Sequence, residues 1–313
     1  MSYPSLRSSA FQGLSAPVQG ALYMTAAAFC FALMNAIIRY TADSLDPLQI
    51  AFFRNLFALA FMLPWLWTQG LGGLRTRRLR LHIVRGLVGY LSMVLWFFAI
   101  ALLPLAEAVA LNFTVPLFVT AGAAVFLGEI VRARRWSATA IGFIGVLIIL
   151  RPGFGEVSWV TSLPVLAAAV MAATALMVKS LSETESPSVI VLYMNLFLTP
   201  LSLIPALFVW QWPSWPVLGL LVLLGLFAVL AHLAFTRAYA KADASAVMPF
   251  DYARLPFVAI IGYLVFSEAT DLWIWLGAAV IAGSAIYIAR REATVAKERP
   301  VSGAAGHSVQ GRG

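Results

Sequence analysis

Charged residues are scarce in this chain of 313 residues: Asp, Glu, Lys and Arg make up 11% of it, against about 25% in ordinary soluble domains. Hydrophobic residues reach 62%, so the composition excludes a soluble globular core. The net charge of +8 does not indicate a nucleic-acid partner, because the basic residues fall between apolar runs and not on one solvent-exposed face.

Cysteine and histidine are also rare. The single cysteine, Cys30, lies in an apolar run, which excludes a disulfide framework or a cysteine-based metal cluster within one chain. The three histidines, His82, His232 and His307, are scattered over the chain, and neither an H-E-x-x-H pair nor a glycine-lysine phosphate loop is present. We therefore expect a protein that is not an enzyme and needs neither a metal nor another cofactor.

Long hydrophobic runs dominate what remains. About 20 apolar residues are needed to cross a bilayer as a helix, and ten segments of roughly that length are separated by Gly, Pro or charge. Because every backbone polar group must be paired inside lipid, these spans are expected to be helices. The predicted spans are approximately 18–39, 47–68, 83–103, 106–128, 136–151, 159–179, 187–210, 214–237, 245–267 and 271–289.

The positions of Lys and Arg predict how the chain is oriented. With a cytoplasmic N-terminus, seventeen of the 21 basic residues fall on the cytoplasmic side, Arg85 among them, and only Arg39 and Arg151 fall on the other. The positive-inside rule therefore places both termini in the cytoplasm, and we expect the spans to lie in a bacterial inner membrane. Residues 1–17 and 291–313 are predicted to be disordered cytoplasmic tails.

The chain contains an internal repeat. PLQIAFFRNLF from Pro47 matches PSVIVLYMNLF from Pro187, and VFLGE ending at Glu129 matches VFSE ending at Glu268, both at an offset of about 140 residues. Two units follow, 18–153 and 159–290, with five spans each. Because five is odd, the second unit must cross the membrane in the opposite sense, and such inverted repeats are typical of secondary transporters.

The segment FFAIALLPLAEAVALNFTVPLFVTAGAAVFLGEIVRARRWSATAIGFIGVLIILRPG resembles the fourth and fifth helices of an EamA repeat. The chain is thus similar to ten-helix members of the drug/metabolite transporter (DMT) superfamily. That resemblance implies an all-α membrane protein that moves small metabolites by alternating access. We expect export of amino acids, as by the YddG-type exporters. The alternatives are uptake of a metabolite or vitamin such as S-adenosylmethionine or riboflavin, or export of drugs and quaternary ammonium compounds.

The stretch MPFDYARLPF places Asp251 and Arg254 three residues apart inside an apolar run, between Pro249 and Pro256. A charge at the bilayer centre costs at least about 2.5 kcal/mol, so this pair needs a reason. We expect it to line a central cavity between the two repeats, with Arg254 or Arg54 binding a substrate carboxylate and Asp251 binding an ammonium group or exchanging a proton. A structural ion pair that fixes helix packing is the alternative.

Matching the fourth span to the ninth places Asn112 opposite Asp251, with a proline soon after each. Arg54 resembles an arginine common in EamA proteins, with a lipid-headgroup contact as the alternative. His232 is a proton-relay candidate, with a hydrogen bond between helices as the alternative. The predicted substrate-binding residues are Asn35, Arg54, Tyr90, Trp96, Asn112, Asp251, Tyr252 and Arg254; the predicted proton-coupling residues are Asp251 and His232; and the predicted helix breaks are Pro116, Pro249 and Pro256. The expected partners are a small-molecule substrate and the lipid bilayer, and a monomer is plausible.

Overall fold

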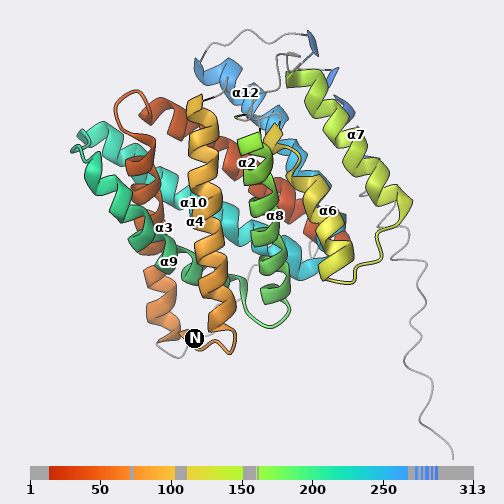
Figure 1. Ribbon diagram of the computed structural model, residues 1–313, viewed down its shortest axis with the longest axis horizontal. Coiled ribbons are helices and arrows are strands. Elements are labelled where there is room, and N and C mark those ends of the chain that lie inside the picture. Colours follow the sequence, from red (N-terminus) through yellow and green to blue (C-terminus); the bar gives the residue numbers. More distant parts are fainter. Residues whose placement is uncertain are drawn as a thin grey trace, which may run out of the picture.

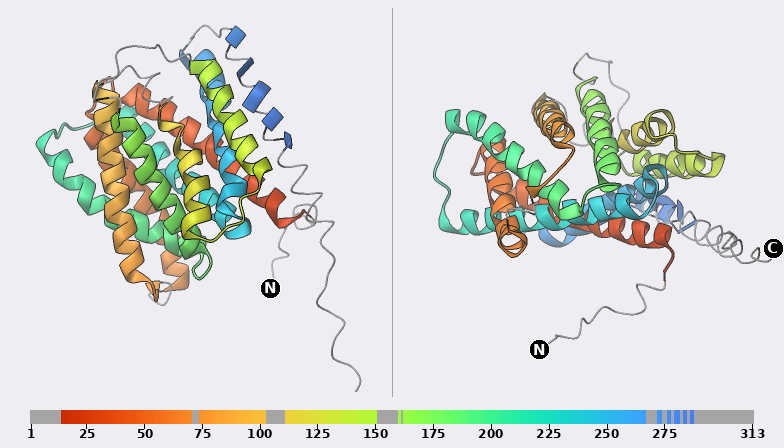
Figure 2. Two further views of the ribbon diagram at one scale, coloured as in Figure 1. Left: turned by 45° about the vertical axis from the view of Figure 1, so that its right-hand side comes forward. Right: turned by 90° about the horizontal axis from the view of Figure 1, so that it is seen from below.

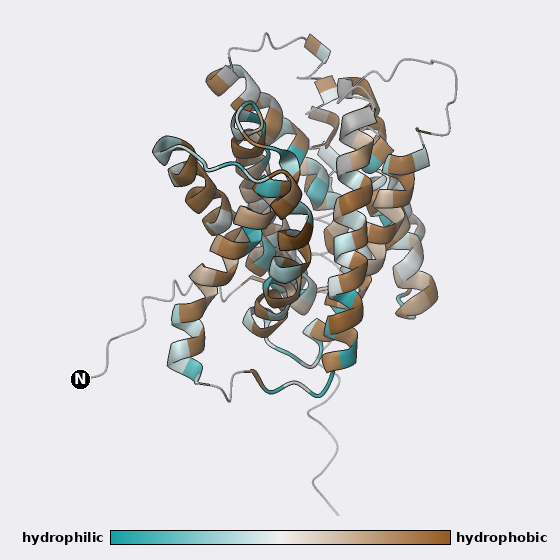
Figure 3. Cartoon of the chain, turned by 60° about the vertical axis from the view of Figure 1, so that its left-hand side comes forward, coloured by the Kyte–Doolittle hydropathy of each residue, from teal (hydrophilic) through white to brown (hydrophobic). Residues whose placement is uncertain are grey.

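A computed structural model describes residues 14–70, 74–102, 111–150, 160, 162–266 and several short stretches between 272 and 287. Each of the ten predicted spans contains helical residues, and the described part of the chain has no β-strand. Seven helices are long and apolar enough to cross a membrane, and hydrophobic residues run along their length (Figure 3). The prediction of an all-α membrane protein is confirmed. The C-terminal tail from 291 and residues 1–13 of the N-terminal tail lie outside the described residues.

The helices follow the repeat. The first unit contains α2 to α7 and the second contains α8 to α12. The bounds are α2 Ala16–Thr41, α3 Pro47–Gln69, α4 Leu79–Leu102, α6 Val115–Phe126, α7 Ala133–Leu150, α8 Ser162–Ser182, α9 Pro187–Phe208, α10 Trp215–Lys241, α11 Ala244–Val247, the 3-10 helix η3 Met248–Ala253 and α12 Arg254–Phe266.

The repeated Pro47 and Pro187 mark equivalent helix starts. The side chain of Asp46 accepts a hydrogen bond from the backbone N–H of Leu48 at 2.9 Å, and Ser186 accepts one from the N–H of Val189 at 3.4 Å. Each cap satisfies an otherwise unpaired N–H, and proline fits the first turn because it has no N–H to lose. The two units therefore use the same local signal to begin their second helix.

The helices of the two units exchange packing partners. In the first unit α2 packs against α10 of the second unit, and correspondingly α8 packs against α4, while α3 and α9 pack against each other. Figure 1 shows α4, α8 and α6 side by side, with α2 and α10 running obliquely behind them; Figure 2 shows the same layers from two other directions. This exchange is the arrangement expected of two units related by an approximate two-fold axis.

One contact occurs twice and shows how close the helices come. A Cβ at Gly86 of α4 would meet the side chain of Phe197 on α9, and a Cβ at Gly225 of α10 would collide with Phe57 and the backbone of Ala58 on α3. Phe57 and Phe197 are equivalent residues of the repeat. In both units, glycine on one helix accommodates a phenylalanine of the opposite unit.

The units have opposite directions in the bundle. Pro17, at the start of α2, lines the same pocket as Lys179, near the end of α8. Since α2 and α8 are equivalent first helices, one begins where the other ends, and the predicted inverted repeat is confirmed. We call this end of the bundle, which is lower in Figure 1, the basic end. Its cations include Arg75, Arg77, Arg78, Arg80, Arg132, Arg134, Arg135, Lys179 and Lys241.

Candidate functional site

A polar cluster lies where the two units meet. On α3, Arg54 places its Nη2 2.8 Å from Nε2 of His232 on α10, and its Nη1 donates to Oδ1 of Asn55 at 3.2 Å. The contact joins an arginine of the first unit to a histidine of the second. Arg54, predicted to bind the substrate, and His232, predicted to relay protons, are therefore in direct contact.

The second part of this cluster is the ion pair between Asp251 and Arg254, which lies in the segment MPFDYARLPF. Nη2 of Arg254 donates to Oδ1 of Asp251 at 2.5 Å, as the spacing of three residues on a helix allows. The Arg254 guanidinium also lies over the ring of Phe31, 4.6 Å from its centroid. The rings of Phe31 and His232 also pack against each other at 84°, with centroids 5.3 Å apart. Phe31 therefore contacts both Arg254 and His232.

Arg85 is a member of this region that sequence reasoning missed. It was assigned to the cytoplasmic side by its position near the start of a span, but it is buried within α4 with 6% of its surface exposed. Its guanidinium donates to the carbonyl of Ile190 at 3.5 Å and to the sulfur of Met194 at 3.4 Å, and it lies in the same region as His232. The sequence signal that could have indicated this burial is the run IVRGLV, in which the arginine stands among apolar residues.

These arginines are incompletely paired within the described part of the chain. The Nε atoms of Arg54, Arg85 and Arg254 are all buried and have no hydrogen-bond partner there. Asp251 is the acidic residue that pairs with one of these arginines, Arg254. We call Phe31, Arg54, Arg85, His232, Asp251 and Arg254 the central cluster. It presents excess positive charge and spare N–H donors beside aromatic rings, which suits a flat ligand rich in oxygen acceptors.

The chain is not a continuous α-helix beside this cluster. Residues Met248–Ala253 form a 3-10 helix between α11 and α12, so Pro249 lies inside the irregular turn and Pro256 lies in the first turn of α12. In the first unit, α6 starts at Val115 after a turn, with Pro116 in its first helical turn. A 3-10 segment within a helical span often marks a functional hinge.

Equivalent residues of the two units also touch each other. Tyr252 is fully buried and its ring centroid lies 6.0 Å from that of Phe113. A Cβ at Gly142 would collide with the Tyr252 ring, so glycine is required there. Asn112 does not reach the central cluster in this structure, and its Nδ2 donates to the sulfur of Met171 at 3.4 Å.

The remaining predicted residues are spread more widely. Tyr90 is half-buried and packs against the apolar core formed by α3, α9 and α10, and Trp96 on α4 is half-buried. Asn35 on α2 is exposed. The central cluster thus unites Arg54, His232, Asp251 and Arg254, and the other predicted positions lie around it or apart from it.

At the basic end, the two units are joined by hydrogen bonds. Both carboxylate oxygens of Glu129 bind the start of α11: Ala244 N–H donates at 2.7 Å, Ser245 N–H at 3.1 Å and Ser245 Oγ at 2.6 Å. Next to it, Nη1 of Arg135 is 2.9 Å from Oδ2 of Asp243. These contacts hold the α6–α7 connection and α7 against the α10–α11 connection.

A second set of contacts joins the units on the other side of the same end. Glu185, just before α9, binds Nε2 of His82 at 2.6 Å and accepts a hydrogen bond from the hydroxyl of Thr76. Arg78 donates to the carbonyl and the hydroxyl of Ser180 at 2.7 and 2.9 Å. The structure is therefore held together at the basic end from both sides.

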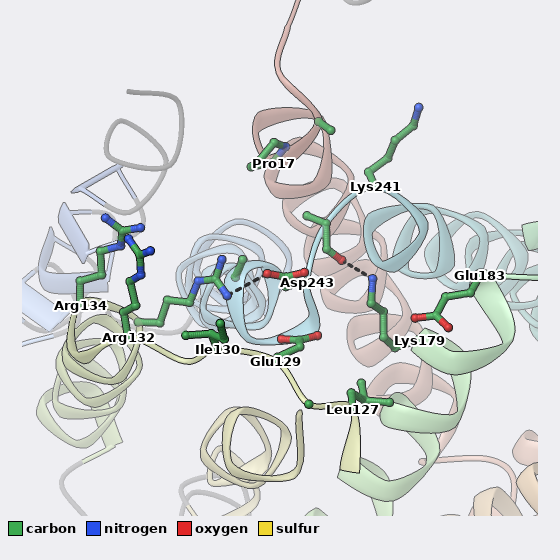
Figure 4. Close-up of a pocket in the computed structure, with 15 residues that line it drawn as sticks. Pro17, Leu127, Glu129, Ile130, Arg132, Arg134, Lys179, Glu183, Lys241 and Asp243 are labelled. Atoms are coloured by element: carbon green, nitrogen blue, oxygen red, sulfur yellow. Dashed lines mark hydrogen bonds and ion pairs between the residues drawn. The ribbon is translucent and has the colours of Figure 1, made fainter. Parts of the chain in front are cut away.

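The pocket at this end has a volume of about 600 Å³. Figure 4 shows it between Arg132 and Arg134 on one side and Lys179 on the other, with Glu129 and Asp243 between them. Lys179 donates to the carbonyls of Tyr239 and Ala242 at 3.0 and 2.9 Å. None of the residues that line this pocket belongs to the central cluster, and it was not predicted from the sequence.

Comparisons with known proteins identify the family of this chain. Residues 18–151 and 158–290 each match the EamA-like transporter family. The chain is 40% identical to the riboflavin transporter of Vibrio cholerae, covering 88% of this chain and 94% of that protein. It is 31% identical to the S-adenosylmethionine uptake transporter of Rickettsia felis, covering 81% and 86%. One crystal structure shares the fold, with a TM-score of 0.74 and 20% identity over 87% of this chain and 98% of that one.

These relatives support a carrier of small molecules and not an enzyme. Amino-acid export, the first expectation from sequence, gains no support from their names, whereas the alternative of a vitamin or metabolite carrier does. The helical repeat indicates the transport fold and does not by itself identify the substrate. Since the family covers nearly the whole membrane region in two copies, this chain belongs to the EamA-like transporter family of the drug/metabolite transporter superfamily.

Proposed function

We propose that this protein carries riboflavin, or a closely related flat heteroaromatic vitamin, into the cell by alternating access. The observation that carries the proposal is the central cluster, in which Arg54 contacts His232, Arg254 lies over Phe31 and pairs with Asp251, and Arg85 lies nearby. The 40% identity to a riboflavin transporter over most of the chain supports the same substrate.

The chemistry of riboflavin fits this cluster. Its ring system is planar and carries two carbonyl oxygens, on either side of a ring N–H, and these oxygens can accept hydrogen bonds from the guanidinium of Arg54 or Arg254. Its flat face can pack on Phe31 or His232. The hydroxyl groups of its side chain need further polar partners, and the half-buried residues around the 3-10 helix, such as Asn112, are candidates.

The charge of the cluster argues against S-adenosylmethionine. That molecule carries a sulfonium and an ammonium group against one carboxylate, so it enters with a net positive charge. Three arginines near His232 and one acid would repel it in a medium of low dielectric constant. The cluster therefore favours a neutral substrate with oxygen acceptors.

We further propose that the basic end faces the cytoplasm of a bacterium and that the protein lies in the inner membrane, in agreement with the positive-inside rule. Binding between two inverted units is the arrangement that allows access from either side in turn. In this proposal Asp251 and His232 stay candidates for proton coupling, because both lie between the units.

Uptake of radiolabelled riboflavin into proteoliposomes containing the purified protein tests the proposal. We expect saturable uptake that unlabelled riboflavin inhibits and that S-adenosylmethionine or a mixture of amino acids does not. Absence of saturable riboflavin uptake, or equal inhibition by S-adenosylmethionine, would refute it.

A matched pair of variants separates binding from folding. Arg54→Gln removes a donor of the central cluster and, at about 1.5–3 kcal/mol for a hydrogen bond to a charged group, raises the KM for riboflavin about tenfold or more. Arg80→Gln removes the same charge from an exposed position at the basic end and leaves KM unchanged. Equal KM values for the two variants would place substrate binding away from Arg54.

A further inference from the structure

The pocket at the basic end has a composition that substrate transport does not explain. Its walls carry five basic side chains and three carboxylates. Two of the carboxylates are already engaged, since Glu129 binds the start of α11 and Asp243 pairs with Arg135. Arg132 and Lys241, both exposed, therefore add positive charge that those acids do not balance.

The cations come from both units and from opposite sides of the pocket. Arg132 and Arg134 lie in and just after the connection between α6 and α7, and Lys179 and Lys241 lie at the ends of α8 and α10. Figure 4 shows the two arginine side chains next to each other on one wall. Neighbouring guanidinium groups on one wall are suitable donors for a phosphate group, which offers acceptors on several sides.

An apolar surface adjoins this charged pocket. Val125, Phe126 and Ile130 are between 75% and 80% exposed, and Ile130 lines the pocket itself together with Leu127. The cavity of about 600 Å³ is also much larger than a bare phosphate ion requires. The site thus combines cations with apolar contacts at the level where helices leave the membrane.

We propose that this pocket binds the phosphate group of an anionic phosphate ester, supplied either by a phospholipid headgroup or by a soluble metabolite. Basic pockets between transmembrane helices at the cytoplasmic side are suited to anionic headgroups, and the exposed apolar residues would contact the acyl chains. Because residues of both units line the pocket, a ligand that fills it contacts both units and stabilises the form closed at the basic end. The proposal does not depend on riboflavin as the transported substrate.

Thermal unfolding of the full-length protein in lipid nanodiscs tests the site. One arm compares nanodiscs of phosphatidylcholine with nanodiscs containing phosphatidylglycerol, and the other adds glycerol phosphate to phosphatidylcholine nanodiscs. The double variant Arg132→Gln with Lys241→Gln removes two cations of the pocket. The matched control, Arg75→Gln with Arg80→Gln, removes two exposed cations of the same end outside the pocket.

We expect anion binding to raise the unfolding midpoint of the wild type and the control. The pocket variant loses affinity about fivefold for each cation removed, or about 30-fold in all. A response to phosphatidylglycerol alone identifies a lipid site, and a response to glycerol phosphate identifies a soluble ligand; either supports the proposal. An equal response of the pocket variant and the wild type, an equal loss in both variants, or no response of the wild type to either anion overturns it. If the double variant does not fold, the single substitutions at these two exposed positions give the same comparison.

Discussion

Glu129 allows a quantitative test of how the basic end is held closed. Its carboxylate accepts three hydrogen bonds from the backbone and side chain at the start of α11. Glu129→Gln keeps the size of the side chain but removes its charge. It also replaces one acceptor oxygen by an amide NH₂, which faces backbone N–H groups it cannot bind.

The expected magnitude follows from these bonds. Hydrogen bonds to charged groups contribute about 1.5–3 kcal/mol each, and the glutamine retains part of the interaction through its remaining oxygen. A net loss of about 2 kcal/mol from the closed state shifts the equilibrium about 30-fold toward the state open at the basic end, since about 1.4 kcal/mol corresponds to a factor of ten. Thermal stability changes little if the glutamine is hydrated in the open state.

Cysteine labelling measures this shift. In a Cys30→Ser background, Val247→Cys places a thiol at a position that is 1% exposed in the closed structure. Val247 is the last residue of α11, and Glu129 binds the start of that helix. The rate of reaction with a membrane-impermeant reagent supplied at the basic end is expected to rise about 30-fold on Glu129→Gln. Glu183→Gln, which removes an exposed carboxylate of the same pocket, is the control. A labelling rate unaffected by Glu129→Gln would refute the role of these contacts in closing the basic end.

Other predictions concern packing and binding. Gly225→Ala forces a Cβ into Phe57 and the α3 backbone and should lower the free energy of unfolding by about 1–3 kcal/mol. At Gly219 an added Cβ meets open space, so Gly219→Ala should raise the free energy of unfolding by about 0.5–1 kcal/mol. Thermal melts of the two variants check this, and equal unfolding midpoints would contradict it. Arg254→Lys keeps the charge but loses the planar fork, so KM for riboflavin should rise at unchanged folded yield; an unchanged KM would remove Arg254 from the site. Arg85→Met removes a buried cation and should raise the unfolding midpoint while lowering transport; parallel melts and uptake assays check this, and reduced stability with normal uptake would mean that Arg85 is structural.

The lengths of the hydrophobic runs and the internal repeat were sufficient to predict the fold. Residues at an offset of about 140 predicted the two units, and the repeated Asp46–Pro47 and Ser186–Pro187 starts appear as equivalent helix caps. The odd number of spans then required the inverted arrangement. These features could be predicted because lipid constrains the length and hydrogen bonding of every span, whatever the substrate.

The site was less predictable because its members depend on contacts between helices. Phe31 lies in an apolar run of the sequence. No local sequence pattern distinguishes an aromatic ring that contacts the guanidinium of Arg254 from one that packs in the apolar core. Arg85 was assigned to the cytoplasmic side because a residue near a span end has two possible environments, the headgroup region or the interior. Its burial is decided by α9, which supplies Ile190 and Met194.

The asymmetry of the structure has a consequence for transport. At the basic end the units are tied together through Glu129, Arg135 and Glu185, while at the opposite end Gln49 and the backbone of Gln211 exchange hydrogen bonds. Because the units are inverted copies, an exchange of their conformations would open the basic end and close the opposite one. The Arg54–His232 contact joins one residue from each unit, so the two must separate or reorient during that exchange. A substrate that accepts hydrogen bonds from Arg54 can replace His232 as its partner, and we therefore expect substrate binding and the opening of the basic end to be energetically coupled at this contact.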